Sequence, residues 1–174
     1  VMQRIGFPWS PSLVARTLAS AGGTLEAART ALDVGFAGVL AGGTHHAYRA
    51  EGSGFCVFND LAIAAADLLA RGAAQRVLIV DLDVHQGDGT ASLVRDDPTI
   101  YAFSMHAARN YPAVKPPSDL DVALPDGIGD AEYLDLLAAH LPRAIAESRA
   151  DAVIYLAGAD PYFADRLGFL ALSK

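Results

Sequence analysis

The sequence has little cysteine and no long hydrophobic run. Cys56 is the single cysteine of 174 residues, which excludes an intramolecular disulfide and favours a reducing compartment. No uninterrupted apolar run approaches the ~20 residues of a membrane-spanning helix. The opening VMQRIGFPWSP has neither the charged start nor the long apolar centre of a signal peptide. We therefore expect a cytoplasmic protein that does not bind membranes.

Basic residues are also scarce. Thirteen Lys and Arg face twenty Asp and Glu, for a net charge of -7, and the only lysines are Lys115 and Lys174. Nucleic-acid binding needs clustered basic side chains, so we expect no nucleic acid as a partner. The acidic balance is compatible with a cationic substrate. At 52% hydrophobic and 19% charged residues, the composition is typical of one globular domain.

Apolar segments alternate with amphipathic ones along the chain. Strands that are apolar throughout and alternate with helices indicate a parallel sheet covered on both faces, so the predicted fold is a three-layer α/β domain. Gly22 and Gly23 are expected to separate two helices, and Asn59 or Asp60 is expected to cap the next. The predicted helices are 12–19, 24–34, 61–70, 88–95 and 130–148, the predicted strands are 36–40, 77–80, 100–105 and 152–157, and 107–129 is predicted to be mostly loop.

Polar groups follow three of the predicted strands. They are GGTHH at 42–46, DLDVH at 81–85 and GADP at 158–161. In parallel sheets, ligands collect beyond the carboxyl ends of the strands, so these three groups are expected to converge.

The second group has the outline of a metal site. Asp81, Asp83 and His85 would share one face of an extended chain, and three such groups on a buried strand are costly unless they are paired or bind a metal. An EF-hand loop counted from Asp81 needs Gly at its sixth position and Glu at its twelfth, but Gln86 and Ser92 stand there. A phosphoryl-transfer site with an Asp nucleophile stays open as an alternative.

The other two groups offer a pair of histidines and a further carboxylate that the metal site would need. His45 and His46 follow two glycines, whose conformational freedom allows both side chains to face one site. Such histidines need partners that fix their tautomers, and Asp81 and Asp88 are the obvious candidates. Asp160 follows the last strand and is the expected third ligand.

The motifs GGTHHA, GFCVFND, VDLDVHQGDG, FSMH, LPDGIGDAEY and YLAGADP, in this order, resemble the zinc-dependent histone deacetylase superfamily. GFPWSP and ADRLGFLAL resemble its bacterial branch closest to class IV. The resemblance covers essentially the whole chain, and it implies the arginase/deacetylase fold with Zn²⁺ as cofactor, Fe²⁺ as its alternative, and a structural K⁺.

The resemblance also implies roles for individual residues. Those matching zinc ligands are Asp83, His85 and Asp160. His46 matches the general base that activates water and then acts as the acid, and His45 would act mainly through electrostatics. The carboxylate partners are Asp81 and Asp88; the acyl-lysine channel matches Gly54, Phe55 and Tyr111; and the potassium site matches Asp81, Asp83, His85, Ser104 and Met105, largely through backbone carbonyls.

One family feature has no counterpart in this sequence. The family places a tyrosine, whose hydroxyl helps bind the oxyanion, after a glycine-rich strand end near its C-terminus. Tyr162 is too close to Asp160 to replace it, and Val1 opens within the pattern. We therefore expect residues 1–174 to be a single deacetylase-like domain fragment that is incomplete at both ends.

The resulting hypothesis is zinc-dependent hydrolysis of an acylated amine, in an acetyl-lysine protein, a polyamine or a small metabolite. A water activated by the metal would attack, with histidine as acid and base. The alternatives are a non-catalytic zinc-binding fragment and, with less support, a Mg²⁺-dependent phosphoryl-transfer enzyme. The oligomeric state is not predictable from the sequence.

Overall fold

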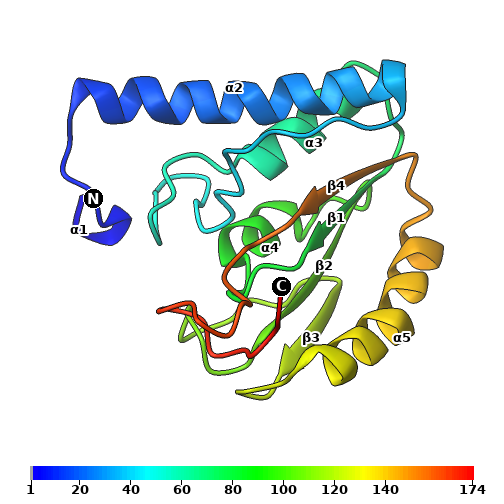
Figure 1. Ribbon diagram of the computed structural model, residues 1–174. Helices are drawn as coiled ribbons and strands as arrows, with labels where there is room; N and C mark the ends of the chain where they lie inside the picture. Colours follow the sequence, from blue (N-terminus) through cyan, green and yellow to red (C-terminus); the bar gives the residue numbers. More distant parts are fainter. Residues whose placement is uncertain (1) are drawn as a thin grey trace.

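Four parallel strands form the centre of the protein (Figure 1). The structure is a computed structural model that describes residues 2–174, and its sheet has the order β3-β2-β1-β4. The strands are β1 (Val77–Asp81), β2 (Ile100–Ala107), β3 (Leu120–Leu124) and β4 (Ala152–Leu156). The helices are α1 (Met2–Ile5), α2 (Pro11–Val34), α3 (Asp60–Ala70), α4 (Asp88–Val94) and α5 (Asp130–Ser148). This arrangement confirms the predicted α/β fold with a parallel sheet flanked by helices.

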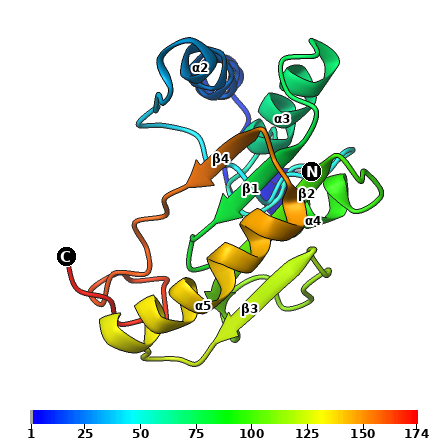
Figure 2. The ribbon, with the colours of Figure 1, turned by 90° about the vertical axis from the view of Figure 1, so that its right-hand side faces the viewer.

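Helices cover both faces of the sheet. Helix α5 packs against β1 and β2 on one face, and α3 and α4 pack on the other (Figure 2). Helix α2 lies outside this arrangement, packed on α3. Within residues 2–174, no helix is long and apolar enough to cross a membrane.

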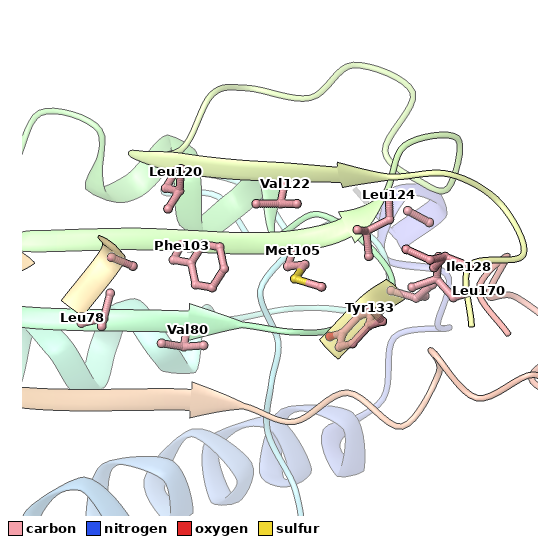
Figure 3. Close-up of a cluster of buried hydrophobic side chains, with 13 residues drawn as sticks. Leu78, Val80, Phe103, Met105, Leu120, Val122, Leu124, Ile128, Tyr133 and Leu170 are labelled. Carbon is pink, nitrogen blue, oxygen red and sulfur yellow. The ribbon is translucent and has the colours of Figure 1, made fainter. Parts of the chain in front are cut away.

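Alternation along β1 divides the core into two clusters. Leu78 and Val80 face α5, where they join Phe103 and Met105 of β2 and Tyr133 of α5 (Figure 3). Val77 and Ile79 point to the opposite face and pack with the apolar stripe of α3. Because side chains alternate in a strand, Asp81 falls on the α3 face, and this directs its carboxylate towards the loop that precedes α3.

Most predicted elements are present, with small shifts at their ends. Asn59 is the N-cap of α3, as one of the two alternatives predicted, since its side chain accepts a hydrogen bond from Ala62 N–H. The prediction that Gly22 and Gly23 separate two helices is wrong, because α2 continues through both. A Cβ on Gly23 would lie 3.0 Å from Val39, so close packing accounts for one of these glycines.

Two other predictions about strands are wrong, and one strand lies in a segment that was predicted to be mostly loop. Residues 36–40 form no strand, since none of the four strands of the described chain pairs with them, and Phe36 and Leu40 are exposed. The predicted loop 107–129 contains β3, whose alternating burial is that of an edge strand. Strand β4 was expected to be buried, but Val153 and Tyr155 are exposed because α5 covers β1 and β2.

Candidate active site

Three candidate metal ligands meet at the carboxyl ends of two neighbouring strands. Asp83 and His85 follow β1, and Asp160 follows β4, which pairs directly with β1. One ligand atom from each residue lies within 4.8 Å of the other two. His85 Nδ1 is 3.0 Å from Asp83 Oδ1 and 3.0 Å from Asp160 Oδ2. The sheet topology therefore brings together the three residues that the sequence suggested as ligands.

The chain after β1 is not extended, contrary to the sequence prediction. β1 ends at Asp81, and the chain then bends, with Asp83 N–H donating to Asp81 Oδ1 at 3.1 Å. His85 N–H donates to Asp83 Oδ1 at 2.8 Å in the same way. Such turns by aspartate side chains replace the strand ladder. They point Asp81 towards the tandem histidines while Asp83 and His85 meet Asp160.

Each tandem histidine is bound to its own carboxylate. His45 Nδ1 lies 2.7 Å from Asp81 Oδ2, and His46 Nδ1 lies 2.6 Å from Asp88 Oδ1. Both imidazoles are buried. A carboxylate can only accept, so each Nδ1 carries the proton in the neutral ring and each Nε2 keeps its lone pair.

The surroundings shift the pKa values of the two histidines in opposite directions. Burial works against the charged form of His45, but the adjacent Asp81 carboxylate outweighs it and raises the pKa of His45 to about 9. At His46, burial together with the neighbouring His45 charge outweighs the Asp88 hydrogen bond and lowers the pKa. At neutral pH the pair therefore holds one protonated and one neutral imidazole.

Tyr48 is a member of this network that the sequence analysis did not identify. Its hydroxyl donates to Asp88 Oδ2 at 2.8 Å, so Asp88 is held by His46 on one oxygen and by Tyr48 on the other. The signal available in the sequence was its position two residues after His46.

Two of the three residues expected to line a channel, Gly54 and Tyr111, lie against His46. A Cβ on Gly54 would lie 2.6 Å from His46 Cδ2, and Tyr111 packs edge-on to the His46 ring at 4.8 Å between centroids. Phe55 has a φ of 63°, which is rare for a residue with a side chain and typical of functional sites. A hollow beside Tyr111 is lined also by Ser53, whose hydroxyl lies 2.7 Å from that of Tyr111.

The residues suggested for potassium lie at the same edge of the sheet. Ser104 pairs with Asp81 in the register of β1 and β2, and Met105 is buried beside it. The role of their carbonyls stays a prediction. His106 is buried on the same strand, with its Nδ1 2.9 Å from Ser104 Oγ, and His140 lies on α5.

The sequence profile of the histone deacetylase domain matches residues 4–174. The chain belongs to the histone deacetylase family. It is 54% identical over 99% of its length to an uncharacterized protein of Picosynechococcus, covering 57% of that protein. It is 33% identical over 99% of its length to Histone deacetylase 2 of Arabidopsis thaliana, covering 43% of it. It thus spans about half the length of these curated relatives.

Solved structures of the family have the same fold. An acetylpolyamine aminohydrolase from Burkholderia pseudomallei is 26% identical with a TM-score of 0.75, over 88% of this chain and 48% of that one. The HDA15 HD domain is 27% identical with a TM-score of 0.74, over 88% of this chain and 49% of that one.

Proposed function

We propose that this protein is a zinc-dependent hydrolase of acylated amines, of the deacetylase type and of the bacterial class IV-like branch. The observation that carries the proposal is a cluster of three side chains of metal-ligand type beside two histidines that are hydrogen-bonded to carboxylates. Family membership supports the same reaction. We expect a cytoplasmic protein with a K⁺ held at the end of β1 and β2, as the sequence suggested.

The three side chains fit a catalytic divalent cation. Asp83, His85 and Asp160 offer two carboxylates and one imidazole within 4.8 Å of one another, a mixed oxygen and nitrogen set that suits Zn²⁺ and also Fe²⁺. Three protein ligands leave a coordination position open. When bound, such a cation polarises an amide carbonyl and makes a water acidic near neutral pH.

His46 is placed to move the proton in this reaction. Its Nδ1–H is engaged by Asp88, so Nε2 is the free acceptor, and the lowered pKa keeps that atom unprotonated at neutral pH. Once protonated, the same atom can donate to the leaving amine. His45 stays charged beside Asp81, and its Nε2 lies 3.8 Å from Asp83 Oδ1, so it contributes positive charge to the site.

The substrate side is formed by Gly54, Phe55 and Tyr111. Tyr111 packs edge-on to His46, and both Tyr111 and Phe55 are exposed aromatic rings, which suits contact with the apolar stem of an acylated amine. A protein lysine, a polyamine and a small metabolite all present such a stem. The phosphoryl-transfer alternative gains no support, because Lys115 Nζ donates to the carbonyls of Asn110 and Pro112.

Acetate release tests the proposal. The chain loaded with Zn²⁺ is incubated with an acetyl-lysine peptide and, separately, with acetylputrescine, and zinc stoichiometry is measured on the same sample. We expect one zinc and turnover above His46→Ala, with Asp88→Asn between the two. Stoichiometric zinc without turnover above His46→Ala would leave a non-catalytic zinc-binding protein. Mg²⁺-dependent phosphate release without a zinc site would favour the phosphoryl-transfer alternative.

A further inference from the structure

The tandem histidines lie in a segment that has no secondary structure of its own. Residues 36–58, between α2 and α3, contain no helix or strand, only one isolated bridge between Ser53 and Cys56. Buried backbone groups outside a ladder must find other partners. The partners used here show what fixes the position of His45 and His46.

Asn59 binds the backbone on both sides of His46. Its side-chain amide nitrogen lies 3.2 Å from His45 O and 3.3 Å from Ala47 O, and it also donates to Thr90 Oγ1 at 2.9 Å. Its carbonyl oxygen accepts from Ala62 N–H and caps α3. Asn59 is only 4% exposed, so these bonds are shielded from bulk solvent. One side chain therefore joins the start of α3 to α4 and to residues 36–58, the histidine loop.

Asp60 binds the start of the same loop. It is fully buried and accepts from Gly43 N–H at 2.9 Å and from Thr44 N–H and hydroxyl, both at 2.7 Å. Thr24 of α2 donates to it at 2.6 Å. Gly42 and Gly43 have φ of 110° and 70°, and a Cβ on Gly42 would collide with the carboxylate. Four donors and the α3 N-terminus compensate the buried charge.

These contacts fix the loop to a rigid element. The apolar stripe of α3, Leu61, Ala65 and Leu68, packs on Val77 and Ile79 of β1, the strand that ends at Asp81. The histidine rings are thus held by Asp81 and Asp88, and their backbone is held from α3. Asp81 ends β1, on which α3 packs, and Asp88 begins α4, which packs on β2 and α3, so the sheet and its helices together fix the histidines relative to the proposed metal ligands.

We propose that Asn59 and Asp60 are positioning residues that hold the tandem histidines in register with their carboxylate partners and the metal ligands. The proposal rests on the proposed function, in which His46 moves the proton. Neither residue touches the reacting atoms. Their loss therefore lowers the catalytic constant through displacement of His46 and leaves substrate affinity nearly unchanged.

Asn59→Asp separates the two tasks of Asn59. The variant keeps the oxygen that caps α3 but loses the donors, and it sets a carboxylate against the carbonyls of His45 and Ala47. We expect the amide of Thr90, which donates to His45 O at 3.0 Å, to exchange with deuterium roughly tenfold faster. Exchange at Ile63 in α3 stays unchanged. In an active enzyme we expect kcat to fall roughly 10- to 100-fold with KM within about threefold.

Ser10→Ala is the matched control, because it removes the side-chain cap of α2 at a site outside the histidine loop. It should change neither Thr90 exchange nor kcat. Asp60→Asn is the second variant if Asn59→Asp fails to fold. Because Asp60 accepts hydrogen bonds from the amides of Gly43 and Thr44, we expect these two amides to exchange faster in this variant.

Hydrogen exchange needs no turnover, so the two proposals can fail separately. Absence of acetate release from the wild-type chain would reject the proposed function, and Thr90 exchange would still decide the positioning role. Wild-type exchange at Thr90 in a folded Asn59→Asp protein would overturn it. Faster exchange with an unchanged kcat in an active enzyme would overturn it too.

Discussion

Gly54→Ala is expected to displace His46 from Asp88. Gly54 has a φ of 50°, and an added Cβ would lie 2.6 Å from His46 Cδ2 and 2.8 Å from His46 Cγ. The loop has little room to retreat, because Gly54 N–H donates to Arg4 O and Phe55 N–H to Ile5 O. Rotation of the His46 ring is the remaining relief, and it breaks the 2.6 Å bond to Asp88.

The expected loss of stability follows from two terms. A residue with a Cβ in the left-handed region costs about 1–2 kcal/mol, and breaking a hydrogen bond to a charged group costs about 1.5–3 kcal/mol. Their sum is about 2.5–5 kcal/mol. Gly127 has a φ of 76° and open space around its Cβ position, so Gly127→Ala pays the backbone term alone.

Urea denaturation of both variants, followed by the zinc and acetate assays, checks this reasoning. Zinc affinity should be unchanged in both, because neither substitution touches the proposed ligands Asp83, His85 and Asp160. Turnover of Gly54→Ala should fall about 100-fold, the lower range of a general base, and that of Gly127→Ala should not. Equal losses of stability and equal turnover in the two variants would refute the steric argument.

Three further outcomes follow from the burial of individual side chains and from the proposed metal site. Burial raises the pKa of the Cys56 thiol to about 12, so the protonated form dominates at pH 8, and iodoacetamide should label it only after unfolding. Phe103→Ala should lower the free energy of unfolding by about 3–5 kcal/mol, and Tyr155→Ala, on the exposed side of β4, by under about 1 kcal/mol, by urea titration. Zinc should raise the melting temperature of wild type and His140→Ala, EDTA should reverse the shift, and Asp160→Ala should show none.

The sequence pattern alone was sufficient to predict the helices that keep one apolar face against the core along their whole length. Leu61 to Ala70 and Asp130 to Ser148 were predictable because an apolar stripe lies within each segment, and a capping residue, Asn59, precedes the first. The strand predicted at residues 36–40 is wrong because a short apolar run occurs both in strands and in loops, and the sequence does not show whether a neighbouring strand is there to pair with it. The helix break predicted at Gly23 is wrong, and the residue that packs on this glycine, Val39, lies beyond the end of α2 and comes close only in the folded chain.

The convergence of the candidate metal ligands was predictable from the sequence, whereas the contacts within the site were not. Chemical type and position after apolar strands selected Asp83, His85 and Asp160, since the ends of parallel strands must share one edge. The bend after Asp81 was missed because it depends on hydrogen bonds between an aspartate side chain and the backbone two residues on. Tyr48 was missed because its hydroxyl meets Asp88 only in the folded chain.

The sequence by itself determined the class of fold and the set of ionisable groups at the strand ends, because both follow from local periodicity and residue chemistry. The tertiary structure decided which carboxylate each histidine binds and how the pair is held. Those choices depend on α3, which packs on β1 and presents Asn59 and Asp60 to a loop that has no hydrogen-bonded ladder of its own.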